Sequence, residues 1–289
     1  MEKYYITTPI YYVNDKPHIG HAYTTILADT ISRFRALIGE KPTFLTGLDE
    51  HGLKVQQAAE KNGKAPQDHC DSMAPAFIDL WKKLNINYSD FIRTTEHRHT
   101  KIVQQILTKV HESGDIYMDE YEGWYSISEE RFITEKELDS GQFGEVKQIK
   151  EKNYFFRMSK YQATLIDKIE KDELLIQPKS RKNEVLGFLK NELSDLCISR
   201  PKSRLEWGIE LPFDDNYVTY VWFDALINYI SAIGAYSNDE HFSSLWPADV
   251  HLIGKDILTT HSVYWPTMLL SLGLPLPQRI FAHGWWLTD

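Results

Sequence analysis

Cysteine is scarce in this 289-residue chain: only Cys70 and Cys197 are present, far apart in sequence. That scarcity excludes a disulfide framework and a four-cysteine zinc site, and it fits a reducing compartment, so we expect a cytoplasmic protein. No stretch approaches the roughly 18 consecutive apolar residues that a membrane span requires, so no membrane partner is expected. Glu2 and Lys3 before alternating aromatics do not resemble a signal peptide. Internal repeats and low-complexity segments are absent from the sequence.

Positive charge is also in short supply, with 32 Lys and Arg against 41 Asp and Glu and a formal net charge of −9. This balance argues against non-specific wrapping around nucleic acid. A local basic patch between residues 179 and 204 stays open, although such runs are usually solvated surface. A content of 42% hydrophobic and 25% charged residues is ordinary for a soluble globular protein with a large core. The length suggests one domain carrying an insertion, or two domains.

Short apolar strands alternate with long helices at both ends of the chain. In residues 1–114 we expect strands at 4–9 and 43–47, and helices at 20–38, 53–61, 68–84 and 96–113. In residues 217–289 we expect strands at 218–221, 250–253 and 280–282, and helices at 224–233 and 256–271. This alternation predicts an α/β fold with a doubly wound parallel sheet covered by helices on both faces.

Residues 115–216 have a different pattern, in which short aromatic runs are separated by charged turns and glycines. Two helices are expected there, near 161–171 and 184–196. The pattern indicates an α+β module inserted between the two halves of one split domain.

The start of the first long helix carries two histidines, His18 and His21, on the same side of one turn. Unpaired backbone N–H groups and the positive end of the helix dipole make such a position an anion site. Gly20 between the histidines lets a base or ribose approach the backbone. An isolated pattern of this length also arises by chance, and the histidines could simply cap a core helix.

Three further segments carry candidate ligand contacts. Asp49 follows the second strand and could pair with a substrate ammonium or cap the next helix. Asp256, after Gly254, could likewise cap a helix or accept hydrogen bonds from ribose hydroxyls. Aromatic and apolar side chains at helical spacing follow two of these strands, and taken alone they are more often core than pocket: Trp222, Ala225, Leu226, Tyr229, Ile257, His261 and Trp265.

Taken together, these motifs resemble the methionyl-tRNA synthetase family of class I aminoacyl-tRNA synthetases. The resemblance rests on the order and spacing of segments 9–14, 18–21, 47–52, 220–225 and 254–256, followed by His261 and Trp265, and it covers essentially the whole chain. It implies a Rossmann-like catalytic domain split by a connective-peptide insertion. It also implies methionine–tRNA ligase activity, in which methionine and ATP form methionyl-adenylate and pyrophosphate before methionyl is transferred to the 3′ end of tRNA.

The resemblance also implies residue roles. His18 and His21 would bind the ATP phosphates and stabilise the adenylation transition state. Gly20, Gly254 and Asp256 would contact the nucleotide and its ribose, and the backbone from His283 through Gly284 and Trp285 to Leu287 would meet the adenine. Asp49 would bind the methionine ammonium. The methionine side chain would lie among Ile10, Tyr12, Trp222, Ala225, Leu226, Tyr229, Ile257 and His261, with Trp265 behind, and the polar Tyr12 and His261 would help to reject homologues.

Two departures from the family pattern shape the expectations. The paired cysteines of the family's zinc knuckles are missing, and residues 124–130 resemble the metal-free form of the insertion, so we expect ATP with Mg²⁺ but no structural zinc. The lysine-containing second signature and the helical anticodon-binding domain do not occur in the sequence. We therefore expect a catalytic-domain fragment that binds its ligands but is catalytically impaired, with most tRNA contacts elsewhere. The alternatives are another class I specificity, a small nucleotidyltransferase, or a natural non-catalytic paralogue. The oligomeric state is not predicted.

Overall fold

A single parallel sheet organises the chain. The computed structural model describes residues 2–126, 131–133, 138–139 and 144–285. Six parallel strands are arranged in the order β3-β2-β1-β12-β13-β7. Their bounds are β1 Lys3–Tyr12, β2 Lys41–Asp49, β3 Asp90–Arg93, β7 Leu175–Gln177, β12 Val250–Gly254 and β13 Arg279–His283. The strand order reverses between β1 and β12, which confirms the predicted doubly wound sheet and places a ligand crevice at their carboxyl ends.

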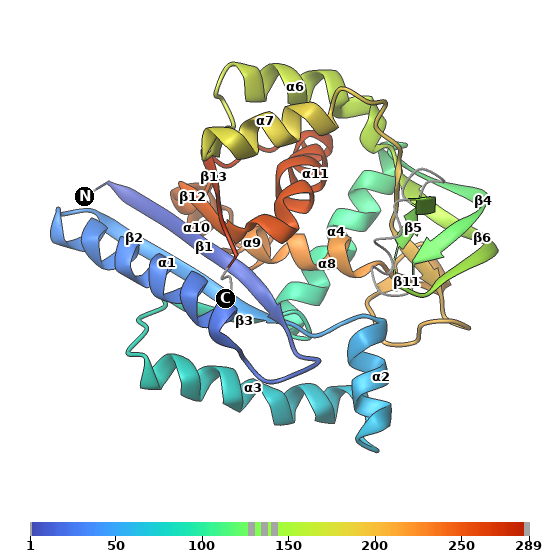
Figure 1. Ribbon diagram of the computed structural model, residues 1–289, viewed down its shortest axis with the longest axis horizontal. Helices are drawn as coiled ribbons and strands as arrows, with labels where there is room; N and C mark the ends of the chain where they lie inside the picture. The colour runs from blue at the N-terminus through green and yellow to red at the C-terminus, as the bar shows by residue number, and fades with distance from the viewer. Residues whose placement is uncertain (1, 127–130, 134–137, 140–143, 286–289) are drawn as a thin grey trace.

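Helices cover both faces of this sheet (Figure 1). The α-helices of the described residues are α1 Ile19–Leu37, α2 Leu53–Lys61, α3 Pro66–Lys83, α4 His97–Glu112, α6 Gln162–Glu170, α7 Lys179–Phe188, α8 Val221–Leu226, α9 Asn228–Ser231, α10 Asp239–Leu245 and α11 Trp265–Leu272. Alternate residues of the strands serve the two faces. Tyr4 and Ile6 of β1 pack with Ala28 of α1, whereas Tyr5 belongs to the larger cluster on the other face.

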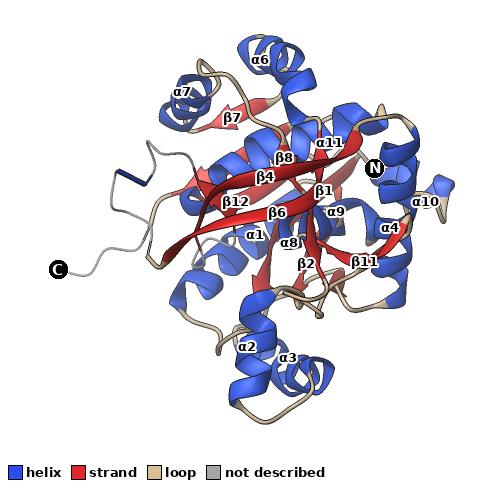
Figure 2. Ribbon diagram, turned by 90° about the vertical axis from the view of Figure 1, so that its right-hand side faces the viewer, coloured by secondary structure: helices blue, strands red, loops and turns tan. Residues whose placement is uncertain are grey.

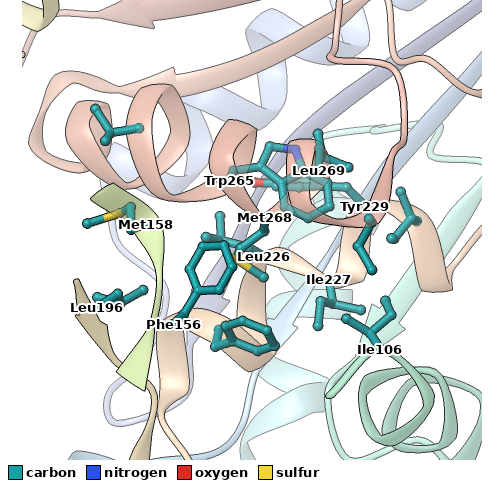
Figure 3. Close-up of a cluster of buried hydrophobic side chains, with 14 of the residues drawn as sticks. Ile106, Phe156, Met158, Leu196, Leu226, Ile227, Tyr229, Trp265, Met268 and Leu269 are labelled. Atoms are coloured by element: carbon teal, nitrogen blue, oxygen red, sulfur yellow. The ribbon is translucent and has the colours of Figure 1, made fainter. Parts of the chain in front are cut away.

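That larger cluster joins α4, α8, α9 and α11 to the sheet. Figure 3 shows Trp265, Tyr229 and Leu226 within it, together with Phe156 and Ile106. The core therefore lies directly behind the helices that carry the candidate pocket residues.

Two small antiparallel sheets complete the fold. One has the order β5-β4-β6-β8, from β4 Ile116–Ser126, β5 Arg131–Ile133, β6 Val146–Phe156 and β8 Leu196–Cys197. Figure 2 shows its two long strands, β4 and β6, running side by side. The other has the order β10-β11-β9, from β9 Ser199–Pro201, β10 Glu210–Leu211 and β11 Asp214–Thr219.

Several sequence-based expectations for the elements were wrong. The strand expected at 218–221 is the end of β11, which pairs antiparallel with β9 and β10 and passes at Val221 into α8. The helix expected at 184–196 is α7, which begins at Lys179 and ends at Phe188. Leu189, Leu193 and Leu196 imitate a helical stripe, but they reach the core from an irregular segment and β8.

The segment 224–233 is an interrupted helix, and the segment 256–271 is a continuous helix that changes type. The first is divided into α8 and α9. The second begins as the 3-10 helix η2, Lys255–Ile257, passes through the π-helix η3, Thr260–Tyr264, and ends as α11. Pro266, which has no backbone N–H, is the second residue of α11 and follows directly on the π-helix.

β3 and β7 were not predicted, because four and three residues are too few to show a period. β7 lies within the 115–216 stretch yet pairs with β13. Part of that stretch therefore contributes to the main sheet, and the division at 114 and 216 stays a prediction.

Close packing between β2 and β3 gives a stability prediction. A Cβ atom at Gly47 would lie 2.0 Å from the carbonyl oxygen of Ile92. We expect Gly47→Ala to lower the free energy of unfolding by about 1–3 kcal/mol, because two backbones must separate. Gly187→Ala, in α7, is the control and should not lower the free energy of unfolding, since a Cβ atom there meets nothing within 4 Å. Urea denaturation would measure both, and equal stability of the two variants would contradict the packing argument.

Candidate active site

A cavity of about 620 Å³ opens at the carboxyl ends of β1 and β12, a size suited to a small-molecule ligand. It is lined by the end of β1, the start of α1, Asp49 at the end of β2, the α8–α9 segment, the start of η2 and the end of β13. Among the described residues, every predicted site residue except Trp265 lines this cavity: Ile10, Tyr12, His18, Gly20, His21, Asp49, Trp222, Ala225, Leu226, Tyr229, Gly254, Asp256, Ile257, His261, His283, Gly284 and Trp285.

The end of β1 reaches the cavity through a break in the strand register. Its pairing with β2 shifts between Thr7 and Ile10, at Pro9, which has no backbone N–H to donate. Beyond the shift, Ile10 and Tyr12 are partly buried and pack against the large core cluster, to which α8, α9 and α11 also contribute. The ring of Tyr11 instead packs 6.3 Å from Phe77 of α3.

The two histidines at the start of α1 cap the helix reciprocally. His18 Nδ1 accepts a hydrogen bond from the Gly20 N–H at 3.1 Å, and His21 Nδ1 accepts one from the His18 N–H at 3.3 Å. Their rings stack with centroids 3.6 Å apart. A neutral imidazole that accepts at Nδ1 carries its proton at Nε2. Both rings can therefore donate from Nε2 at the positive end of the helix dipole.

Electrostatics keeps one of these rings uncharged. Burial, and to a smaller extent the neighbouring His18, lowers the pKa of His21 to about 4. At neutral pH His21 is a directional hydrogen-bond donor and not a cation.

The end of β13 and the β12–η2 turn form the second wall of the cavity. Thr24 Oγ1 is 2.7 Å from His283 Nε2, and the Tyr23 ring meets the His283 ring edge-on at 4.8 Å. The exposed Trp285 has the Lys255 ammonium 3.7 Å from its ring centre. Gly254 leaves room for the Asp256 carboxylate, because a Cβ atom there would lie 2.4 Å from Oδ1. These groups offer flat rings and a carboxylate to a planar, hydroxylated ligand.

The inner end of the cavity is apolar and held by neutral hydrogen bonds. His261 Nδ1–H donates to the Ile257 carbonyl at 3.0 Å, which leaves Nε2 to accept from the Tyr229 hydroxyl at 2.7 Å. Burial lowers the pKa of His261 to about 4, despite the opposing effects of the Ile257 carbonyl and Asp256. His261 lies in the π-helix η3, a distortion that often marks functional sites.

Trp265 was expected among the ligand-binding residues, but it does not line the cavity. It is fully buried behind Tyr229, with the ring centres 5.9 Å apart, and its indole N–H donates to His251 Nε2 at 3.1 Å. Trp265 lies one helical turn beyond His261, and its side chain is in the core. It supports the pocket from behind, through its contact with Tyr229.

Five residues line the cavity that sequence reasoning did not select: Pro9, Tyr11, Ile19, Thr24 and Asn228. Thr24 lies four residues after Gly20 on the same helix face, a spacing that could have identified it. Asn228 lies next to Tyr229 and is completely buried.

The described ranges contain neither a group of metal-binding side chains nor a helix that could cross a membrane. Within them, no three His, Cys, Asp or Glu side chains are grouped to hold a metal ion. Residues 127–130 of the segment read as the metal-free insertion lie outside those ranges, as do residues 286–287 at the predicted adenine contact, so the expectation of no zinc stays a prediction. Every described helix falls short of the length or hydrophobicity that a bilayer crossing requires.

Comparison with known proteins decides the family. The model described as tRNA synthetases class I (M) matches residues 4–143 and 140–289. The chain belongs to the class I methionyl-tRNA synthetase family. The methionine–tRNA ligase of Clostridium tetani is 51% identical over 99% of this chain, and that of Thermotoga maritima is 50% identical over 98%. The chain spans less than half the length of these relatives, 45% and 46%.

Solved members of the methionyl-tRNA synthetase family have the same fold. The Mycobacterium tuberculosis methionyl-tRNA synthetase in complex with methionyl-adenylate is 43% identical, with a TM-score of 0.93, over 98% of this chain and 57% of that chain. The apo form of the Mycobacterium tuberculosis enzyme matches with a TM-score of 0.82 at 41% identity. The Rossmann-like fold expected from the sequence is thereby confirmed.

The depressed pKa values of His21 and His261 give a second prediction. In the folded chain both imidazoles should titrate near pH 4, whereas in the chain unfolded in urea they should titrate near the ordinary value of about 6.5. Between these values the unfolded state binds more protons, so stability should fall as the pH is lowered from about 6.5 to 4. NMR titration of the imidazole Cε1 protons would measure the two pKa values in the folded and the unfolded chain. The variants His21→Asn and His261→Gln would assign the resonances. Titration of either ring near pH 6.5 in the folded chain would contradict it.

Proposed function

We propose that this chain activates methionine as part of a methionine–tRNA ligase. It would bind methionine and ATP, form methionyl-adenylate and pyrophosphate, and transfer methionyl to the 3′ end of tRNA. The observation that carries the proposal is the meeting, in one cavity, of two imidazole donors at a helix N-terminus, the buried carboxylate of Asp49 and a pocket of aromatic rings. The adenylate complex of the Mycobacterium tuberculosis relative supports it.

The chemistry needs no nucleophile from the protein. The methionine carboxylate oxygen attacks the α-phosphorus of ATP, a new oxygen–phosphorus bond forms, and the bond to the bridging oxygen of pyrophosphate breaks. ATP enters as its Mg²⁺ complex. The protein aligns the reactants and stabilises negative charge on the phosphate oxygens. In this proposal the Nε2–H groups of His18 and His21 and the first N–H groups of α1 supply that stabilisation.

The nucleotide would occupy the wall formed by the β12–η2 turn and the end of β13. Gly20 and Gly254 allow close approach of the backbone, Asp256 accepts hydrogen bonds from the ribose hydroxyls, and the segment His283 to Trp285 meets the base.

Methionine would bind with its ammonium on Asp49 and its thioether in the apolar end. The aromatic lining suits sulfur, because sulfur–ring contacts add about 0.3–1.5 kcal/mol to simple burial. An apolar pocket alone discriminates by only about 1–3 kcal/mol per methylene. The polar side chains of Tyr12 and His261 would help to reject homologues, and the Tyr229 hydroxyl holds the His261 ring in place at 2.7 Å.

The tRNA is proposed to bind mainly through other parts of the family's longer chains. The net charge of −9 provides little attraction for a polyanion, and the relatives are more than twice as long as the matched region.

Removing the charge of Asp49 tests the amino-acid site. We expect Asp49→Asn to weaken methionine binding about tenfold to a hundredfold, because a hydrogen bond to a charged group contributes about 1.5–3 kcal/mol. Isothermal titration calorimetry on the chain would measure the dissociation constant. Asp68→Asn, on the exposed side of α3, is the matched control and should bind normally. Unchanged affinity in Asp49→Asn would remove the ammonium site from the proposal.

Replacing His21 tests the phosphate site. We expect His21→Ala to slow methionine-dependent exchange of pyrophosphate into ATP by the natural gene product about a hundredfold to a thousandfold, since one preorganised donor is lost. The methionine dissociation constant should not change. His21→Gln, whose amide N–H can replace Nε2–H, should recover part of the rate. Equal rates for Ala and Gln would show that the ring does not act as a donor.

A further inference from the structure

A buried carboxylate that the chemistry above does not use lies beside the methionine pocket. Asp224 is 1% exposed, with Oδ2 2.6 Å from His51 Nδ1 and Oδ1 2.6 Å from His99 Nε2. His99 Nδ1 in turn lies 2.7 Å from the Ser231 hydroxyl. Burial opposes the ionisation of Asp224, but the two histidines outweigh it and lower the pKa of this carboxyl to about 2. Asp224 is therefore a carboxylate that accepts two N–H bonds.

The three segments joined by this carboxylate are the ones that carry the proposed methionine contacts. His51 comes two residues after Asp49. Asp224 lies in α8 between Trp222 and Ala225, both of which line the cavity. Ser231 belongs to α9, the helix of Tyr229. Asp224 itself does not border the cavity, so it acts on the ligand only through these neighbours.

The loop after β2 is a firm anchor for such a link. The Trp207 carbonyl accepts the Gly52 N–H at 3.1 Å, and the Trp207 indole N–H donates to the Glu50 carbonyl. The buried Glu50 carboxylate also forms an ion pair with the partly buried Arg93 at 2.7 Å. The loop that follows Asp49 therefore has bonds to Trp207 and Arg93 that do not involve α8.

Helix α8 starts from a bonded cap, because the N–H of Tyr220, the residue before it, donates to the Ile198 carbonyl at 2.8 Å. It has six residues, too few to be stable without tertiary contacts. The Tyr220 bond holds the start of α8 against the segment between β8 and β9. The Asp224 bonds instead connect α8 to His51, two residues after Asp49, and to His99 of α4. Because hydrogen bonds are directional, they set the distance and direction of α8 relative to the end of β2.

We propose that Asp224 is a positioning residue for methionine: by bonding His51 and His99 at once, it fixes Trp222 and Ala225 relative to Asp49. It thereby sets the span between the ammonium site and the thioether pocket. The inference rests on the proposed function, since that function assigns methionine to this cavity.

Hydrogen-bond geometry distinguishes two replacements. Alanine removes both acceptors. Asparagine can keep both bonds: its oxygen accepts from His51, and its amide donates to His99 Nε2 when the His99 proton moves to Nδ1. That proton can be accepted by Ser231, whose hydroxyl then donates to the Asn228 carbonyl at 3.4 Å. A positioning role therefore predicts rescue by asparagine.

The experiment measures methionine and ATP dissociation constants on the chain by calorimetry, together with the thermal midpoint. We expect Asp224→Ala to weaken methionine binding about tenfold to a hundredfold, the effect of a displaced contact. ATP binding should stay within about twofold, since its site lies on other elements. Asp224→Asn should return methionine binding to within about threefold of the parent, because both bonds persist.

The matched control is Asp115→Ala, which removes a buried carboxylate bound by Lys160 and Ser271 away from the cavity. It should lower the thermal midpoint without changing methionine affinity. If Asp224→Ala does not fold, the pair His51→Asn and His51→Ala decides, because the asparagine amide can replace Nδ1–H; only the alanine should weaken methionine binding.

The outcomes separate the two proposals. A parent chain that does not bind methionine overturns the proposed function. A binding parent overturns only the positioning role if Asp224→Ala binds methionine normally, if it loses methionine and ATP together, or if asparagine performs no better than alanine. When the His51 pair must decide, equal affinities of its two variants overturn that role as well.

Discussion

The reversal of strand order between β1 and β12 is the constraint on which the site depends. Chain connections leave these two neighbouring strands toward opposite sides of the sheet, so no connection covers their carboxyl ends. The space that remains is bordered by α1 on one side and by the η2–η3 segment on the other. The start of a helix and the ends of two strands thereby point their unpaired backbone groups and side chains at one volume, and the register shift at Pro9 adds Ile10 and Tyr12 to it.

Within that volume, two imidazoles are fixed dipoles and not charges. Burial keeps His21 and His261 neutral, and each ring has one nitrogen occupied by the backbone: the His18 N–H for His21 and the Ile257 carbonyl for His261. The remaining nitrogen is consequently a donor in one case and an acceptor in the other. The chemical role of each imidazole is thus decided by a local backbone bond.

Local signals explain how much the sequence could reveal. The passage from β1 through a turn into α1 is a contiguous pattern, so the sequence alone could place His18, Gly20 and His21, and Asp49 followed from the end of the next strand. The two short strands β3 and β7 could not be predicted, because only their partners make them strands. The bonds of Asp224 to His51 and His99 span 173 and 125 residues, and no periodic pattern links residues so distant.

Contacts between distant residues also show that residues 115–216 are not a separate insertion in every part. Its composition differs from the rest of the chain, yet it supplies β7 to the main sheet and Trp207 to the loop beside Asp49. The Gln56 side chain also accepts the N–H groups of Glu206 and Trp207, both at 3.2 Å. Because hydrogen bonds to backbone groups are directional, they fix the position of the 206–207 segment relative to residues 52–56 more tightly than apolar contacts would. A segment bonded in this way to the loop after Asp49 is part of the framework around the proposed methionine pocket, so composition alone does not mark where that framework ends.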